Sequence, residues 1–268
     1  MEHCEDKNVT EFFQILNQTK IATVFQPIIS LQNGQVMAYE ALSRITLDGC
    51  NMSISDMFDI AAHLKCLWRL EKVCRSKAVK NAIKKPDGVK LFLNVDPNVI
   101  QDPEFVSGFT KEYLDKYKLR TKDIVFEITE RSDVENYEIL QNVVHHYEEQ
   151  GFEIALDDIG AGYSGLNRIN YLNPKFLKID MELIHHIYNS KSKKSLVSML
   201  VKYCENMNGI LIAEGIEQKE ELECLIQLGV KYGQGYYLGK PNSDFIDLEE
   251  NKVKQIQTYQ RQQKTVIV

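Results

Sequence analysis

The sequence predicts a single α/β domain, a modified TIM (β/α)8 barrel whose first strand runs antiparallel to its neighbour. Its length of 268 residues suits a barrel of about 250 residues. From residue 89 onward, short apolar runs alternate with helical patterns, which is typical of parallel βα units. Before them stands Asn33-Gly34, a strong two-residue hairpin signal that predicts antiparallel first strands. An open, doubly wound sheet is the alternative.

The elements follow from hydrophobic spacing and from turn residues. A leading helix is expected around residues 11–16, strands at 23–29 and 35–43, and a long helical region at 53–85 with Ser55 as its N-cap. Further strands are expected at 89–95, 123–129, 152–157, 175–180, 210–214 and 230–233, and helices at 103–117, 134–150, 164–172, 181–207 and 218–228. We divide the chain into a helical lead-in (1–20), a barrel domain (21–245) and a solvated polar tail helix (246–268).

Composition excludes several classes of protein. Hydrophobic residues make up 44% of the chain and charged residues 26%, which is ordinary for a globular domain with a sizeable core. A net charge of −6 argues against DNA as a partner. No apolar run approaches the roughly 18 residues of a membrane span, and the N-terminus lacks the apolar centre of a signal peptide. Six scattered cysteines without a CxxC pair indicate reduced thiols. We therefore expect a cytoplasmic protein that does not associate with membranes.

Two adjacent carboxylates, Asp157 and Asp158, follow the apolar run Ile154-Ala155-Leu156 and precede a glycine-rich loop. Neighbouring side chains on a strand point to opposite faces. Both carboxylates can therefore reach one ligand only where the strand frays into the loop. The alternative is an Asp pair that merely turns the chain and caps a helix.

Polar side chains also end the other expected strands, and active sites of such barrels lie at the C-terminal ends of the strands. They are Glu40, Asn94, Glu127 with Glu130, Asp157 with Asp158, Lys178 with Asp180, Glu214 and Gln234. Only Lys178 and Arg44 oppose the carboxylates, and clustered unpaired carboxylates are costly, so divalent cations are expected. Hard oxygen ligands suit Mg²⁺ or Mn²⁺ rather than Zn²⁺. An Asp pair suits two ions, with Asp157 bridging them, and such sites promote in-line displacement at phosphorus.

These residues resemble a known family. The segment Tyr39-Glu40-Ala41-Leu42-Ser43-Arg44 is similar to the signature of the EAL domain, the bacterial cyclic di-GMP phosphodiesterases. The resemblance runs from about Phe25 to Pro241 with its motifs in family order. They are Gln26-Pro27-Ile28, Glu40-Ala41-Leu42, Leu93-Asn94-Val95, Glu127-Ile128-Thr129-Glu130, Asp157-Asp158, Lys178-Ile179-Asp180, Ala213-Glu214-Gly215-Ile216-Glu217 and Gly233-Gln234-Gly235-Tyr236. The loop after the Asp pair departs mildly from the family pattern at Ile159, Ala161 and Gly165.

The resemblance implies a role for each motif residue. Metal binding falls to Glu40, Asn94, Glu127 and Asp157 for one ion and to Asp157 and Asp158 for the second. Lys178 and Glu214 orient and deprotonate the attacking water, and the sequence does not decide which of them is the base. Glu130 braces the loop after Asp158. Substrate contacts fall to Gln26, Leu42, Arg44 and Gln234, and Tyr237 and Pro241 border a guanine.

The implied function is metal-dependent hydrolysis of cyclic di-GMP to linear 5′-pGpG by in-line attack of water at a two-ion Mg²⁺ or Mn²⁺ site. The first alternative is a catalytically silent cyclic di-GMP receptor that acts through a protein partner, and the second is an unrelated metal-dependent barrel enzyme. The resemblance also implies a homodimer through the helix that begins near Ser164, with Leu166, Ile169, Tyr171 and Leu172 as its apolar residues. A monomer whose apolar residues all face its own core is the alternative.

Overall fold

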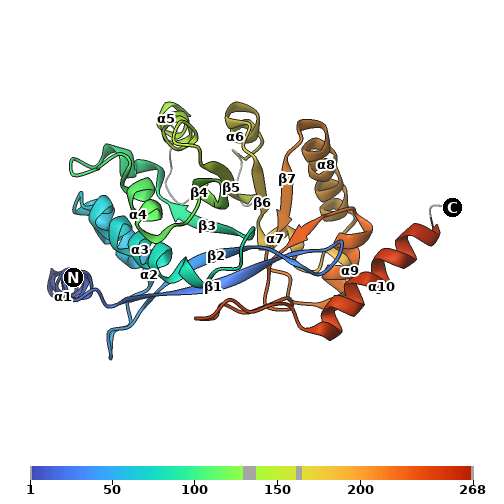
Figure 1. Ribbon diagram of the computed structural model, residues 1–268, viewed down its shortest axis with the longest axis horizontal. Helices are drawn as coiled ribbons and strands as arrows, with labels where there is room; N and C mark the ends of the chain where they lie inside the picture. Colours follow the sequence, from blue (N-terminus) through green and yellow to red (C-terminus); the bar gives the residue numbers. More distant parts are fainter. Residues whose placement is uncertain (1, 129–136, 161–164, 267–268) are drawn as a thin grey trace.

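The barrel is closed. A computed structural model describes residues 2–128, 137–160 and 165–266, and its strands pair in the order β1 to β8 around one closed sheet (Figure 1). The strands are β1 (Ile21–Ser30), β2 (Val36–Ile45), β3 (Lys90–Val95), β4 (Ile124–Ile128), β5 (Glu153–Ile159), β6 (Phe176–Ile179), β7 (Ile210–Ala213) and β8 (Tyr232–Gly233). This confirms the predicted barrel and excludes the open sheet.

The first strand is the antiparallel one, as predicted. β1 pairs antiparallel with β2, placing Gln26 opposite Glu40, and it also pairs antiparallel with β8. The turn between β1 and β2 contains Gly34 at φ +79°, a left-handed conformation that glycine adopts without steric cost. The remaining neighbours, from β2 to β8, pair parallel. Their carboxyl ends therefore meet at one end of the barrel, which we call the mouth.

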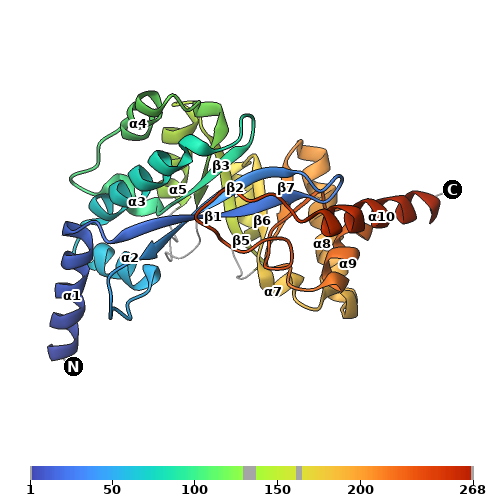
Figure 2. The same ribbon diagram turned by 60° about the horizontal axis from the view of Figure 1, so that its bottom comes forward.

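Helices cover the outside of the sheet (Figures 1 and 2). They are α1 (Glu2–Asn17), α2 (Ile54–His63), α3 (Leu67–Asn81), α4 (Phe109–Tyr117), α5 (Tyr137–Glu148), α6 (Gly165–Leu172), α7 (Met181–Ile184), α8 (Lys191–Met207), α9 (Lys219–Gln227) and α10 (Glu250–Val266), with short 3-10 helices η1 (Ala82–Lys84), η2 (Pro97–Gln101), η3 (Thr121–Asp123) and η4 (Ile187–Asn189). Among the described residues, no helix has the length and apolar character needed to cross a bilayer.

Two expected helices are broken. The region 53–85 divides into α2 and α3 because Lys65 takes a left-handed φ of +54°, and the N-cap is Ser53, paired with Asp56 in a capping box, rather than Ser55. The region 181–207 divides in the same way at His186, with φ +53°. A left-handed residue ends the run of helical hydrogen bonds, and side-chain periodicity alone does not reveal it.

The C-terminal helix is less solvated than expected. In α10, Ile256 and Tyr259 are buried, and the Gln260 side-chain amide donates to the Leu31 carbonyl at 2.9 Å. α10 therefore packs on the barrel rather than lying free in water. At the other end of the chain, α1 buries Phe12 and Ile15. The division at residues 20 and 245 remains a prediction.

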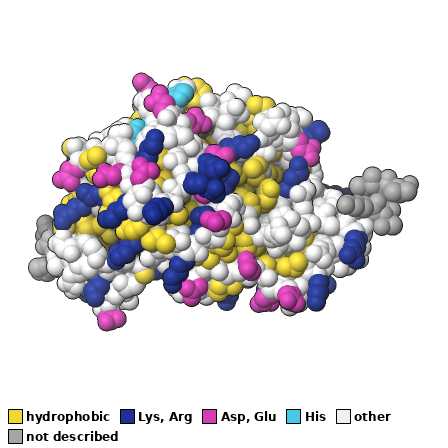
Figure 3. All heavy atoms as spheres, viewed as in Figure 1, with side chains coloured by type: hydrophobic (Ala, Val, Ile, Leu, Met, Phe, Trp, Pro, Cys, Tyr) yellow, Lys and Arg dark blue, Asp and Glu magenta, His cyan; other side chains and the backbone are white. Residues whose placement is uncertain are grey.

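The core has an outer and an inner layer. The outer layer lies between sheet and helices, and the inner layer fills the barrel with residues from β1 to β7: Ile28, Ala38, Phe92, Val125, Ala155, Phe176 and Ile212. Phe92 and Phe176 meet edge to face across the interior, with ring centroids 5.2 Å apart. The interior is thus packed rather than hollow, and it forms an apolar floor beneath the mouth. On the face shown in Figure 3, cationic and anionic side chains are interspersed.

Candidate active site

Polar side chains line the mouth because each strand places every second residue inward. Six of the apolar floor residues are followed two positions later by a polar residue: Ala38 by Glu40, Phe92 by Asn94, Val125 by Glu127, Ala155 by Asp157, Phe176 by Lys178 and Ile212 by Glu214. In β1, which runs the other way, Gln26 precedes Ile28 by two positions. The site is therefore the next inward layer above the floor.

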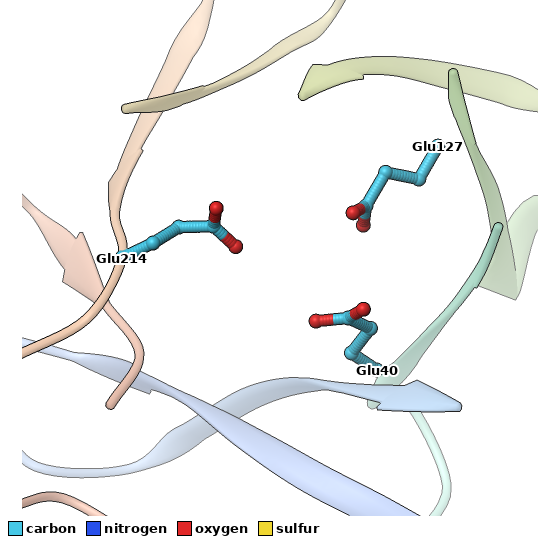
Figure 4. A group of neighbouring side chains, drawn as sticks. All are labelled: Glu40, Glu127 and Glu214. Atoms are coloured by element: carbon cyan, nitrogen blue, oxygen red, sulfur yellow. The ribbon is translucent and has the colours of Figure 1, made fainter. Parts of the chain in front are cut away.

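Three carboxylates from distant strands point toward one another in this layer (Figure 4). Oxygen atoms of Glu40, Glu127 and Glu214 all lie within 4.8 Å of one another, and so do oxygens of Asp157, Asp158 and Glu214. We call these five residues the carboxylate cluster. Glu127 is fully buried, and the side chains of Glu40 and Asp157 are only 9% and 12% exposed.

Lys178 is the cation at the centre of the carboxylate cluster. Its Nζ lies 2.5 Å from Glu127 Oε1, 2.6 Å from Glu214 Oε1, 3.4 Å from Glu40 Oε2 and 3.5 Å from Asp157 Oδ1. Burial acts to lower the pKa of Lys178, but these carboxylates outweigh it and raise the pKa well above its ordinary value. Among the residues that the structure describes, one ammonium thus faces four carboxylates, which gives this part of the site excess negative charge.

The carboxylate pKa values follow from this excess. Burial raises the pKa of Glu127 well above its ordinary range. The charges of neighbouring carboxylates add to this rise, and Lys178 opposes it. Burial raises the pKa of Glu214 in the same way, against the effect of Lys178. For Asp157, burial is outweighed by Lys178 and by hydrogen bonds, and its pKa is lowered. Burial together with the charges of Asp157 and Asp180 raises the pKa of Asp158 to about 6.

A shift in the register of β5 against β6, of the kind that a β-bulge makes, accompanies the approach of two adjacent aspartates, whose carboxylate oxygens lie within 4.8 Å of each other. β5 continues to Ile159, but its register with β6 shifts between Leu156 and Ile159, and Asp158 takes a left-handed φ of +56°. A bulge inserts a residue and re-aims the side chains next to it. The sequence predicts that the strand frays here, whereas in the structure an irregular strand continues to Ile159.

The carboxylate cluster has the donor set that divalent cations require. Glu127 Oε2 and Asp157 Oδ1 are buried and accept no hydrogen bond from the described residues, although Asp157 Oδ1 lies 3.5 Å from the Lys178 ammonium. Carboxylate oxygens left without donors in a buried, negatively charged site are costly unless a cation pairs with them. The metal ligands that the cluster offers are hard carboxylate oxygens, which fit Mg²⁺, Mn²⁺ or Ca²⁺.

Amide side chains complete the inward layer. Asn94 Nδ2 donates to Glu40 Oε1 at 3.1 Å, so the Asn94 amide oxygen remains as a possible ligand. Gln234 Nε2 donates to Glu40 Oε2 at 2.7 Å and to Gln26 Oε1 at 3.1 Å, and Gln26 Nε2 in turn donates to the Gly239 carbonyl at 3.1 Å. Glu40 is thus held by neighbours on both sides.

Other residues expected at the site lie at its edge or elsewhere. Arg44 is exposed near the end of β2 and donates to the Ser43 carbonyl, and Leu42 is partly buried beside it. The Tyr237 hydroxyl donates to Gln255 of α10 at 2.9 Å, and Pro241 is partly buried next to Asn242. Neither joins the contacts of the carboxylate cluster. Glu130 lies outside the described residues.

One group of residues near the site is not predicted by the sequence motifs. Glu71 of α3 is buried, and its Oε1 accepts the backbone N–H of Asp96, two residues beyond Asn94, at 2.7 Å. The spacing of Glu71 and Arg75, four residues apart in a helical pattern, was the available signal. Such spacing usually marks an exposed pair, and here both residues are buried.

Comparisons with known proteins identify the family of this chain. The profile of the EAL domain matches residues 10–241. The chain belongs to the EAL domain family. It is 29% identical over 238 residues to the probable cyclic di-GMP phosphodiesterase PdeG of Escherichia coli, covering 87% of this chain and 46% of PdeG. It is 28% identical to the cyclic di-GMP phosphodiesterase PdeF of the same organism, covering 88% of this chain and 32% of PdeF. The chain thus spans less than half the length of these two relatives.

Solved structures share the fold. A Klebsiella pneumoniae BlrP1 complex with calcium and cyclic di-GMP superposes with a TM-score of 0.76 at 27% identity, covering 85% of this chain and 58% of that one. A standalone EAL protein from Vibrio cholerae O395, bound to cyclic di-GMP, has a TM-score of 0.74 at 29% identity, covering 87% of this chain and 97% of that one. The BlrP1 protein has also been solved with manganese and cyclic di-GMP.

Proposed function

We propose that this EAL domain hydrolyses cyclic di-GMP to linear 5′-pGpG with the help of two divalent cations, Mg²⁺ or Mn²⁺. The observation that carries the proposal is the carboxylate cluster, five carboxylates at the mouth of the barrel with two buried oxygens that accept no hydrogen bond from the described residues. Membership of a family with named cyclic di-GMP phosphodiesterases supports the choice of substrate.

Each side chain has a task that fits its position. Glu40, Asn94, Glu127 and Asp157 would hold one ion, and Asp157 and Asp158 the other. The oxygens of Glu40 and Glu127 lie within 4.8 Å of each other, as do those of Asp157 and Asp158, and Glu214 has an oxygen within that distance of both pairs. When bound, such a pair supplies Lewis-acid polarisation of the phosphodiester and makes the attacking water more acidic. The rest of the chemistry falls to protein groups that bind the substrate, orient the water and move its proton.

Lys178 and Glu214 are the pair that would orient the attacking water and take its proton. Their side chains touch at 2.6 Å, Lys178 as a donor and Glu214 as an acceptor, at the centre of the mouth. Gln26 and Gln234 would present amide groups to the substrate, and Arg44, exposed at the edge, would pair with a phosphate by its planar guanidinium. Leu42 would also contact the substrate, Tyr237 and Pro241 would border a guanine, and Glu130 would brace the loop after Asp158.

The deciding assay is turnover of cyclic di-GMP by the purified chain with Mg²⁺ or Mn²⁺, followed by chromatography of the linear product. Glu40→Ala and Asp157→Ala should abolish turnover and weaken Mn²⁺ binding, because each removes an oxygen ligand. Asp115→Ala, at an exposed position on the outer helix α4, is the matched control and should retain activity. If folded protein forms no linear product with either ion, the proposal is wrong.

The same assay separates the receptor alternative. A silent receptor would bind cyclic di-GMP, measured by calorimetry with Mn²⁺, and release it unchanged. Tight binding without product, under conditions where an active relative turns over, would favour the receptor. Turnover of other phosphoesters with cyclic di-GMP ignored would favour an unrelated barrel hydrolase.

We further propose a homodimer through α6, with activity coupled to it. Ile169 and Leu172 of α6 are buried, whereas Tyr171 is 50% exposed and its ring lies against Tyr137 of α5 with centroids 5.4 Å apart. An exposed aromatic residue on a helix that follows the Asp158 loop fits a symmetric contact. The side chain of Leu166 is outside the described part of the chain.

Sedimentation at micromolar concentration tests the dimer. Tyr171→Glu should give a monomer with reduced turnover, while Ile83→Glu, which also charges an exposed apolar position (55% exposed), should leave the dimer intact. A parent that is monomeric and fully active would refute the coupling. A Tyr171→Glu variant with dimer and rate untouched would refute the placement of the interface.

A further inference from the structure

A buried ion pair behind the barrel wall connects helix α3 to the end of strand β3. Glu71 and Arg75 of α3 are 2% and 4% exposed, and Arg75 Nη2 donates to Glu71 Oε2. Burying two charges rarely adds stability over an apolar pair of the same size. The contacts of this pair therefore indicate a role other than stability.

The carboxylate oxygen of Glu71 that does not contact Arg75 lies at the end of the strand that carries Asn94. Glu71 Oε1 accepts the Asp96 backbone N–H at 2.7 Å, immediately after the last residue of β3, Val95. A backbone N–H just beyond a strand end has lost its ladder partner and needs another acceptor when it is removed from water. Glu71 supplies that acceptor and thereby holds the chain two residues beyond Asn94.

Arg75 fixes Glu71 from the other side. Its Nη1 donates to Thr110 Oγ1 and to Tyr147 Oη, each at 3.1 Å, and its Cζ lies 4.8 Å from the centre of the Phe126 ring. Phe126 immediately precedes Glu127 on β4, and Asn94 pairs with Glu127 in the register of β3 and β4. The pair thus contacts both strands directly next to two members of the inward polar layer.

We propose that Glu71 is a positioning residue, which fixes the end of β3 through the Asp96 N–H and so holds the Asn94 amide in place for a divalent cation. Arg75 acts through Glu71 by fixing its rotamer against the aromatic rings. The inference rests on the proposed function, since Asn94 is a metal ligand only if the mouth binds cations. Groups behind a ligand orient it, and losing them typically costs about 10- to 100-fold in metal affinity or activity.

Two double variants isolate the acceptor for the Asp96 N–H. Both carry Arg75→Met, which removes the buried charge, and they differ in Glu71→Gln or Glu71→Met. Gln and Met have similar length and no charge, but only Gln offers an oxygen to the Asp96 N–H. We expect E71M/R75M to bind Mn²⁺ about tenfold more weakly than E71Q/R75M, measured by calorimetry. Saturating Mn²⁺ should bring the kcat of E71M/R75M back toward that of E71Q/R75M.

The control separates positioning from loss of stability. Ile256→Ala empties a buried position in α10, at the opposite end of the molecule from α3 (Figure 1). It should lower the melting temperature while leaving Mn²⁺ affinity unchanged. Equal Mn²⁺ affinity in the two double variants would overturn the inference.

A second measurement does not depend on E71M/R75M folding. Amide hydrogen exchange should show a protected Asp96 N–H in the parent and in E71Q/R75M, and unprotected exchange in the parent would overturn the inference. A parent that binds Mn²⁺ without turnover contradicts the proposed hydrolysis, but the comparison of Mn²⁺ affinities still decides the role of Glu71. The two failures are therefore distinguishable.

Discussion

Replacing Lys178 with methionine removes the cation at the centre of the carboxylate cluster. The side chain of Lys178 is 1% exposed, and its Nζ lies within 3.5 Å of carboxylates from four different strands. Methionine has nearly the same length, so the change removes the charge with little change in packing. Without added cations, the four carboxylates then face one another with no positive partner among residues 2–128, 137–160 and 165–266.

The burial of Lys178 sets the expected loss of unfolding free energy in Lys178→Met. Removing one partner of a buried ion pair typically costs about 3–5 kcal/mol. Because the pKa values of Glu127 and Glu214 are already raised, these groups can take up protons and keep the cost within that range. For a protein of this size, 1 kcal/mol shifts the melting temperature by roughly 2–4 °C, so a loss of about 6–20 °C is expected.

Thermal unfolding in EDTA, and then with Mn²⁺, measures this effect. Lys178→Met should melt well below the parent in EDTA, and Mn²⁺ should raise its melting temperature by more than it raises that of the parent, because the cations replace the lost charge. Turnover should remain absent, since the water has lost one of its orienting groups. The matched control is Lys202→Met, which removes a 71% exposed lysine from a surface pair with Glu205 and should cost less than about 1 kcal/mol. Equal melting temperatures for the two variants in EDTA would refute the central role of Lys178.

Two further predictions concern the mouth. Asp158→Asn should stabilise the protein in EDTA at pH 7. The pKa of Asp158 is raised to about 6 in the folded protein. A folded state that binds a proton more tightly than the unfolded state loses stability as the pH rises from about 4 to about 6, and the variant avoids this loss. Denaturant unfolding at pH 4 and pH 7 tests this, and a difference between variant and parent that does not grow with pH contradicts it. Gly235→Ala should destabilise by about 1–3 kcal/mol and slow turnover, since a Cβ there would lie 2.2 Å from the Ile216 backbone. Gly49→Ala, at φ +73° with open space around it, measures the cost of a positive φ where no atom stands in the way of the Cβ. A loss in Gly235→Ala no larger than in Gly49→Ala would contradict a cost from the contact with Ile216.

Much of the site could be predicted from the sequence because side-chain direction along a strand is a local property. With a period of two, an apolar residue such as Ala38 or Val125 facing the interior places Glu40 or Glu127 inward as well. The hairpin at Asn33-Gly34 is equally local, since two residues decide the turn. These features need no knowledge of distant parts of the chain.

The tertiary structure decided what depends on contacts between distant segments. Lys178 meets Glu40 across 138 positions of sequence only because the barrel closes. The register shift that accompanies the approach of Asp157 and Asp158 arises from the pairing of β5 against β6, which residue types do not encode one by one. Glu71 belongs to the same group, because its acceptor role exists only once α3 packs behind β3. The sequence by itself determined which residues face the mouth, while closure of the barrel determined which of them touch, because a contact depends on where two segments lie in space and not on either segment alone.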